Sequence, residues 1–163
     1  MLTVPTSWCF RQVLLRAFAP SSIIGMLRIS PNNVKGFETL TRIVVIDDEA
    51  GIRHIIKLAL SQYDVTVLEA ETGITGLDLA LSHNPDLIIL DFRLPDIAGD
   101  MVAERYRAAG GVAPIILLSA SAEIDKLAQH PNITAVLAKP FRLIQLWQTI
   151  ETAINRPLAP AVS

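Results

Sequence analysis

The chain has 163 residues, of which 51% are hydrophobic and 18% are charged, and its formal net charge is −2. This length accommodates one domain of ordinary size with a substantial apolar core, and the apolar content excludes a disordered chain. The single cysteine excludes an internal disulfide and a cysteine zinc cluster, and the near-neutral charge excludes a global basic field that would attract nucleic acid.

The first forty residues differ from the rest in charge. Before Thr41 the chain has four basic residues and one acidic residue, whereas from Arg42 onward it has ten basic and fifteen acidic residues. Arginines interrupt the apolar runs of residues 1–40, so we expect neither a transmembrane helix nor a secretory signal there. Two interpretations stay open. One is a targeting or membrane-contacting segment. The other is an extension without such a role, either flexible or created by an upstream start codon with translation from Met26.

Five short runs of aliphatic and β-branched residues predict strands within residues 41–156. Four of these runs are almost continuously apolar, which is typical of parallel strands that are buried on both faces of a sheet. The second run alternates and carries charge, which indicates an edge strand. In chain order the predicted strands are Arg42–Ile46, Val65–Glu69, Leu87–Leu90, Pro114–Leu118 and Ala135–Ala138.

Segments with apolar residues at helical spacing follow each predicted strand. Their ends are marked by His83-Asn84-Pro85, Gly110-Gly111 and His130-Pro131. In chain order the predicted helical segments are Ile52–Ala59, Leu77–Leu81, Met101–Ala109, Glu123–Gln129 and Leu143–Ile154. This alternation predicts a doubly wound (βα)₅ fold of the flavodoxin-like type, with a parallel sheet of strand order 2-1-3-4-5.

Polar residues stand where four of the predicted strands end. In an open α/β sheet the ligand site lies at the carboxyl ends of the strands, beside the point where the strand order reverses. The first, third, fourth and fifth strands are neighbours in the predicted order, so their ends converge on one cleft. The residues there are Asp47, Asp48 and Glu49 after the first strand, Asp91 after the third, Ser119 after the fourth and Lys139 after the fifth.

The chemistry of these side chains points to phosphoryl transfer. The three aspartates and the lysine together leave two negative charges, which one divalent cation offsets. Ligation by oxygen alone suits Mg²⁺. Transfer of a phosphoryl group to a carboxylate requires positioning and neutralisation of the charge on the phosphoryl oxygens. Mg²⁺, an ammonium and a hydroxyl beside a carboxylate provide both.

These residues resemble the receiver domain of bacterial two-component response regulators, the family of the single-domain chemotaxis regulator. Ile46–Glu49 is similar to the acidic pair of that family, and Leu90–Asp96 with Gly99 is similar to its phosphoacceptor loop. Leu118–Ala120 resembles the position of its switch hydroxyl, and Lys139–Phe141 resembles its lysine with the cis-proline turn that follows. The resemblance covers about Thr41 to Arg156.

The resemblance implies a role for each site residue. Asp91 would accept a phosphoryl group from a phosphohistidine of a sensor histidine kinase or a histidine phosphotransfer protein. Asp48, Asp91 and the main-chain carbonyl of Arg93 would bind Mg²⁺ directly, and Asp47 would help through water. Lys139 would pair with the phosphoryl oxygens, and the hydroxyl of Ser119 would hydrogen-bond one of them.

The resemblance also implies how the protein acts. We expect a cytoplasmic phosphoacceptor that loses its phosphoryl group slowly, and not an enzyme with a substrate of its own. Only residues 157–163 follow the last predicted helix, so we expect a stand-alone receiver. Its signal would pass to a protein target or along a phosphorelay, without nucleic acid or membrane as partner. The protein would be a monomer, or a dimer that forms on phosphorylation.

The sequence leaves alternatives open. Taken singly, each site residue has an ordinary structural use as a helix cap, a turn residue or a surface charge. A Mg²⁺-dependent phosphatase with Asp91 as its nucleophile is a second function, although such enzymes need a second carboxylate where Arg93 stands. A receiver that works without phosphorylation is a third. One residue departs from the family pattern: Val136 occupies a position that often carries an aromatic ring coupled to the switch hydroxyl.

Overall fold

The computed structural model describes residues 41–120, 124–155 and Leu158. The predictions about residues 1–40, about Glu123, about the end of the domain at Arg156 and about the tail 157–163 apart from Leu158 lie outside these residues. Among the described residues, no helix has both the length and the apolar character that crossing a membrane requires.

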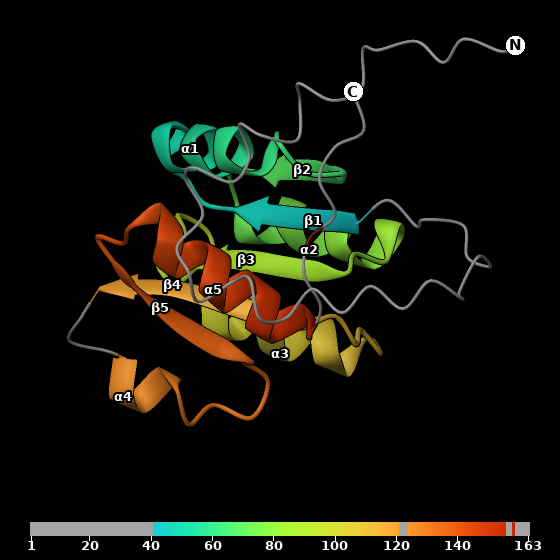
Figure 1. Ribbon diagram of the computed structural model, residues 1–163. Helices are drawn as coiled ribbons and strands as arrows, with labels where there is room; N and C mark the ends of the chain where they lie inside the picture. The colour runs from blue at the N-terminus through green and yellow to red at the C-terminus, as the bar shows by residue number, and fades with distance from the viewer. Residues whose placement is uncertain (1–40, 121–123, 156–157, 159–163) are drawn as a thin grey trace, which may run out of the picture. The chain divides into compact units, whose positions relative to one another are not determined.

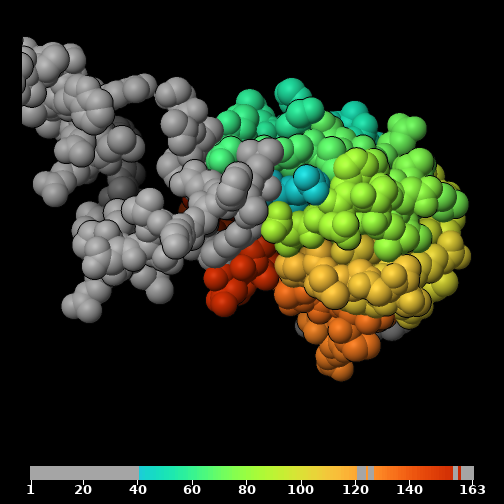
Figure 2. Space-filling view, turned by 90° about the vertical axis from the view of Figure 1, so that its right-hand side faces the viewer, coloured from blue at the N-terminus to red at the C-terminus, as the bar shows by residue number. Residues whose placement is uncertain are grey.

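Five parallel strands form one sheet in the order β2-β1-β3-β4-β5, as the sequence predicts (Figure 1). The first strand pairs with β2 on one side and with β3 on the other, so the strand order reverses between β1 and β3. In the space-filling view of Figure 2 the colours run in bands, from blue-green at the top through green and yellow to orange at the bottom. The strands are β1 Thr41–Ile46, β2 Val65–Ala70, β3 Leu87–Asp91, β4 Ile115–Ala120 and β5 Ala135–Lys139.

A helix follows each strand, and the helices cover both faces of the sheet. Apolar side chains of β1, β3 and β4 are fully buried on both faces, which explains why these strands are continuous apolar runs. One core layer packs the sheet against α1 and α5, and the other packs it against α2, α3 and α4. The helices are α1 Ala50–Leu60, α2 Gly73–His83, α3 Gly99–Ala108, α4 Ile124–Leu127 and α5 Leu143–Ile154.

Two details differ from the sequence-based expectations. Strands β3, β4 and β5 extend to include Asp91, Ser119 and Lys139, so these residues belong to their strands and do not follow them. Asp91 and Lys139 are the last residues of β3 and β5, and Ser119 is the last but one of β4. Asp91 pairs with Leu118, and Ser119 pairs with Ala138, so the parallel ladder continues through the polar residues. Among the described residues, the fourth helix ends at Leu127, two residues before the predicted end at Gln129. The prediction of β2 as an edge strand is confirmed.

Candidate functional site

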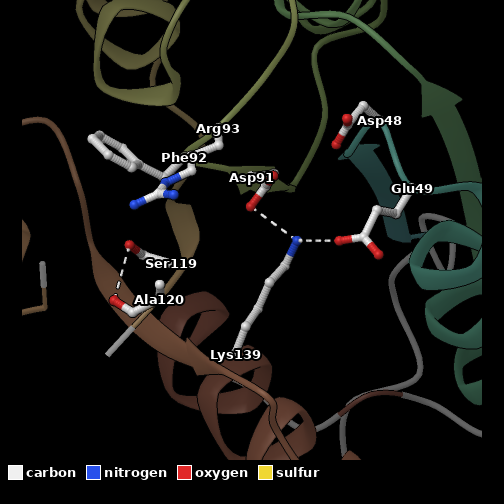
Figure 3. A pocket seen from close by; sticks show the side chains of 8 residues that line it. All are labelled: Asp48, Glu49, Asp91, Phe92, Arg93, Ser119, Ala120 and Lys139. Carbon is white, nitrogen blue, oxygen red and sulfur yellow. Dashed lines mark hydrogen bonds and ion pairs between the residues drawn. The ribbon is translucent and has the colours of Figure 1, made fainter. Parts of the chain in front are cut away.

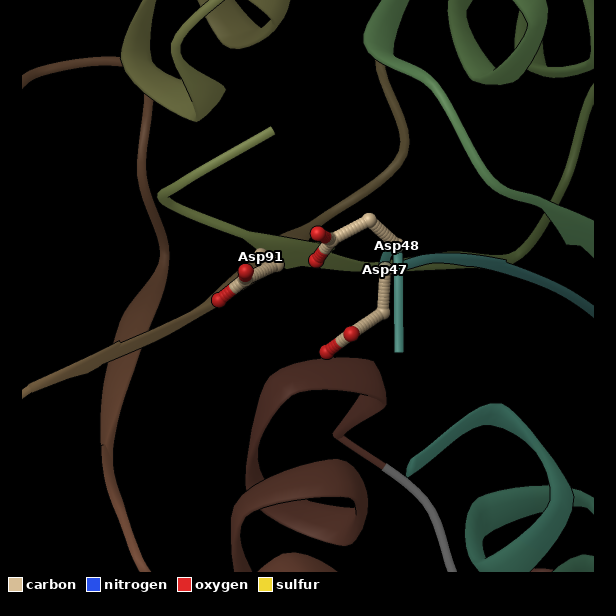
Figure 4. A group of neighbouring side chains, drawn as sticks. All are labelled: Asp47, Asp48 and Asp91. Atoms are coloured by element: carbon tan, nitrogen blue, oxygen red, sulfur yellow. The ribbon is translucent and has the colours of Figure 1, made fainter. Parts of the chain in front are cut away.

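The sheet brings the carboxyl ends of its central strands to one place. Asp47 directly follows β1, and its buried N–H donates to the carbonyl of Ala70 at the end of β2. Asp91 ends β3, and the register aligns Ile46 of β1 with the residue before it. The carboxylates of Asp47, Asp48 and Asp91 each offer an oxygen within 4.8 Å of the others (Figure 4). The predicted convergence of these three aspartates is confirmed.

Lys139 places one ammonium among these carboxylates. Its Nζ lies 2.8 Å from Oδ2 of Asp47, 3.0 Å from Oδ1 of Asp91 and 3.6 Å from Oε1 of Glu49. Lys139 ends the edge strand β5, so its side chain reaches across the ends of β4 and β3 to meet Asp47 beside β1. The peptide bond to Pro140 is cis, as the resemblance implies.

The electrostatics of the cluster follow from burial and from this cation. Burial raises the pKa of Asp91, and the charges of Asp47 and Asp48 raise it further, while Lys139 opposes both effects. Burial alone would lower the pKa of Lys139, but its hydrogen bonds to Asp47 and Asp91 outweigh burial and raise it. The lysine is therefore charged at neutral pH. By formal charge, the three aspartates outnumber it.

The donor set fits a hard divalent cation. The groups that converge are oxygens of three carboxylates, which Mg²⁺ accepts readily, and no nitrogen or sulfur ligand stands among the residues of this cluster. Asp48 is exposed, whereas Asp47 and Asp91 are buried, so a cation would enter from the side of Asp48. A bound cation of two positive charges would offset the excess negative charge that Lys139 leaves.

A cleft of about 370 Å³ opens above Asp91 (Figure 3). Ser119 and Arg93 lie on one side of Asp91, and Asp48 and Glu49 lie on the other. Ser119 is 2% exposed, and its hydroxyl donates to the carbonyl of Ala120 at 3.3 Å. In the cleft, the carboxylate of Asp91 thus lies between the hydroxyl of Ser119 and the carboxylates of Asp48 and Glu49, and the ammonium of Lys139 forms part of the wall.

The loop after Asp91 is fixed by backbone contacts. The N–H of Phe92 donates to the carbonyl of Leu118, and the N–H of Gly99 donates to the carbonyl of Phe92. A Cβ at Gly99 would collide with the main-chain oxygen of Asp91, which explains why the residue that begins α3 is glycine. The Asp96 carboxylate accepts hydrogen bonds of 2.8 Å from the N–H groups of both Gly73 and Ile74 in the first turn of α2.

Five of the six predicted site residues line the cleft, and the sixth contacts one of them. Asp48, Asp91, Arg93, Ser119 and Lys139 line it, and the fully buried carboxylate of Asp47 contacts Lys139. Val136 is half-buried and packs against the core layer of α2, α3 and α4. The individual roles of these residues in catalysis stay predictions.

Sequence reasoning assigned no role to two residues that hold the site in place. Arg53 of α1 donates hydrogen bonds to the carbonyls of Asp47 and Asp48, and Asp96 links the loop after β3 to α2. Both bind main-chain groups, which are present at every position and leave no pattern in the sequence. The dipeptide Pro95-Asp96 is a turn signal, but it does not indicate that Asp96 binds the first turn of α2.

The fold and the site together define a doubly wound α/β domain with an acidic site at its strand-order reversal. Residues 43–151 match the family model of the response regulator receiver domain, so the chain belongs to that family. The predicted family and the predicted flavodoxin-like fold are confirmed.

Individual relatives agree with this assignment. The KDP operon transcriptional regulatory protein KdpE of Escherichia coli (strain K12) is 36% identical over 118 residues, which cover 72% of this chain and 52% of KdpE. This chain therefore spans about half the length of that regulator, and it spans a similar share of several others.

Solved structures show the same arrangement. A response regulator receiver domain protein from Clostridium thermocellum is 28% identical with a TM-score of 0.65, covering 71% of this chain and 95% of that one. The receiver domain of sensor histidine kinase PA1611 from Pseudomonas aeruginosa PAO1 is 27% identical with a TM-score of 0.64, covering 71% and 98%. That receiver domain has a magnesium ion coordinated in its active site cleft.

Proposed function

We propose that Asp91 accepts a phosphoryl group from a phosphohistidine on a sensor histidine kinase or a histidine phosphotransfer protein, in a reaction that requires Mg²⁺. The observation that carries this proposal is the environment of Asp91. Its carboxylate faces a cleft, lies 3.0 Å from the ammonium of Lys139 and shares its surroundings with the carboxylates of Asp47 and Asp48. Family membership and the magnesium-bound relative support it.

The transfer step forms one bond and breaks another. An oxygen of the Asp91 carboxylate attacks phosphorus while the bond between phosphorus and the donor's imidazole nitrogen breaks, and the histidine leaves as neutral imidazole once it has taken up a proton. Mg²⁺, when bound, would neutralise charge on the phosphoryl oxygens. Asp48, Asp91 and the main-chain carbonyl of Arg93 would hold it, with Asp47 acting through water.

The other residues of the cleft hold the product. The Lys139 ammonium forms an ion pair with the unphosphorylated Asp91 carboxylate. After transfer it would pair with an oxygen of the acyl phosphate. The Ser119 hydroxyl lies at the end of the neighbouring strand β4, from which it would donate to another phosphoryl oxygen. Water would slowly cleave the bond between the Asp91 oxygen and phosphorus, releasing inorganic phosphate and the free carboxylate.

The proposal extends to the wider role of the protein. We propose a cytoplasmic receiver that signals through contact with a protein target or through onward transfer to another histidine, with no direct part for nucleic acid. It turns over no substrate of its own apart from this slow self-dephosphorylation. The position of Val136 implies that the signal leaves the site without the rotation of an aromatic ring.

Incubation with acetyl phosphate tests the proposal. Mass spectrometry of the intact protein should show one added phosphoryl group in the presence of Mg²⁺ and none after chelation. Asp91→Asn should abolish the addition, whereas the control Asp78→Asn, on the exposed surface of α2, should retain it.

Other outcomes would support the alternatives. Sustained hydrolysis of phosphomonoesters by the wild type, abolished by Asp91→Asn, would indicate a phosphatase with Asp91 as its nucleophile. No added phosphoryl group from acetyl phosphate or from any phosphohistidine donor would indicate a receiver that works without phosphorylation. Either outcome would contradict the proposal.

A further inference from the structure

Arg53, in the first turns of α1, reaches back to the acidic loop between β1 and α1. Its Nη1 donates to the main-chain carbonyl of Asp47 at 2.6 Å and to that of Asp48 at 3.2 Å. The Arg53 side chain is only 15% exposed, so the guanidinium is part of the packed structure and not a solvated surface charge. Both carbonyls lie beyond the last paired residue of β1, where the sheet ladder supplies no donor to them.

The guanidinium is held from its other side by an anion on β2. Its Nε lies 3.8 Å from Oε2 of Glu69, and the other oxygen of Glu69 accepts a 2.6 Å hydrogen bond from Lys57. Glu69 pairs in register with Val45 of β1, two residues before Asp47. The chain of contacts therefore ties the acidic loop to both α1 and β2.

The main chain of Asp48 decides where its carboxylate points. Aspartate has a short side chain, so a shift of its backbone moves the carboxylate by a similar amount. Figure 4 shows the Asp48 carboxylate directed toward Asp91. Asp47 has a second restraint, because its Oδ1 accepts a 2.9 Å hydrogen bond from the N–H of Glu49 and its Oδ2 binds Lys139. The hydrogen bond from Arg53 restrains the main chain of Asp48 itself.

We propose that Arg53 is a positioning residue for the divalent cation site, which holds the main chain of Asp47 and Asp48 so that their carboxylates converge with that of Asp91. This inference rests on the proposed Mg²⁺-dependent function. Residues that orient metal ligands without touching the metal typically change metal affinity when they are substituted. Arg53 contacts the backbone of the residues that carry the ligands, and not the ligand atoms themselves.

Direct binding of Mn²⁺, followed by electron paramagnetic resonance of the free ion, tests the inference without any phosphoryl transfer. Arg53→Gln should raise the Kd for Mn²⁺ by about 10-fold, because the loop loses both hydrogen bonds. The matched control is Lys57→Gln, which removes the other cation bound to Glu69 but touches neither carbonyl. It should leave the Kd within about twofold of the wild-type value. Thermal unfolding with chelator should show that both variants are folded at the temperature of the titration.

The outcomes separate this inference from the proposed function. Wild-type protein that binds no Mn²⁺ would overturn the proposed function and this inference with it. Wild-type protein that binds Mn²⁺, together with Arg53→Gln that binds it equally well, would overturn the inference alone. If Arg53→Gln does not fold, Glu69→Gln takes its place, because it removes the anion that holds the guanidinium. Weaker Mn²⁺ binding by that variant supports the inference, and an unchanged Kd overturns it.

Discussion

Lys139 and Asp47 stand 92 positions apart in the chain, yet the ammonium of the first lies 2.8 Å from the fully buried carboxylate of the second. The lysine belongs to the edge strand β5, and the aspartate follows β1, so the contact spans the ends of the two strands between them. The same ammonium lines the cleft and lies 3.0 Å from Oδ1 of Asp91. The contact makes Lys139 a structural partner of the acidic cluster before any phosphoryl group arrives.

Removing this ammonium should destabilise the protein in a way that depends on divalent cations. Lys139→Met leaves two buried carboxylates without their cation, and we expect a loss of about 2 kcal/mol in the free energy of unfolding, measured by urea denaturation with chelator. Saturating Mg²⁺ should restore part of the loss, because it supplies positive charge to the same carboxylates. Lys57→Met, at an exposed ion pair, should lose at most about 0.5 kcal/mol. An equal loss for Lys139→Met with and without Mg²⁺ would contradict this account.

Replacing the phosphoacceptor should stabilise the metal-free protein. The pKa of Asp91 is raised, by burial first and then by Asp47 and Asp48, so its ionised form carries a penalty in the folded state. That penalty is present above the raised pKa and fades as the pH falls through it. Asp91→Asn should therefore gain about 1 kcal/mol at neutral pH in urea denaturation with chelator. The gain should shrink in acid, and a loss of stability at neutral pH would count against this account.

The start of α3 should not tolerate a larger residue. A Cβ at Gly99 would meet the main-chain oxygen of Asp91, which is fixed by the sheet and cannot move aside. We expect Gly99→Ala to cost about 2 kcal/mol and to slow phosphorylation by acetyl phosphate, because it displaces the loop after Asp91.

A second glycine provides the control for that substitution. A Cβ at Gly51, in the first turn of α1, meets nothing within 4 Å. Gly51→Ala should raise stability by about 0.5 kcal/mol, because alanine has the higher helix propensity. Equal effects of the two substitutions on stability would show that the Gly99 contact has no consequence.

Asp96 should contribute stability only when it is ionised. Burial alone would raise the pKa of its carboxyl, but hydrogen bonds from Ile74 and Gly73 outweigh burial and lower it. A lowered pKa means that the contribution is present above the ordinary pKa of aspartate and is lost as the pH falls through the folded-state value. Asp96→Ala should cost about 1 kcal/mol at neutral pH, the usual value of a helix cap. Thermal unfolding at several pH values should show the difference vanishing in acid, and a difference independent of pH would refute this role.

The fold was predictable because parallel strands that are buried on both faces have continuous apolar sequences. The site was predictable for a related reason: Asp91, Ser119 and Lys139 interrupt the apolar pattern where their strands end. Whether such a residue ends the strand or follows it was not predictable, because pairing with the neighbouring strand decides it. Leu118 and Ala138 supply that pairing.

The supporting contacts of the site were beyond sequence reasoning. Arg53 binds two main-chain carbonyl oxygens, and Asp96 binds two main-chain N–H groups. Because every residue has such groups, the sequence does not reveal these partners. The predicted end of α4 was wrong for another reason. Its apolar residues are too few to define a helical period, and the helix ends at Leu127, before the predicted Gln129.

The most direct test of the central claim is to locate the phosphoryl group on the chain. Borohydride reduces an aspartyl phosphate to homoserine, which peptide mass spectrometry identifies at a single position. After brief incubation with acetyl phosphate and Mg²⁺, we predict homoserine in place of Asp91 and at no other aspartate, and none when Mg²⁺ is chelated. Homoserine in place of Asp47 or Asp48, or no conversion in the presence of Mg²⁺, would contradict the claim that Asp91 is the phosphoacceptor.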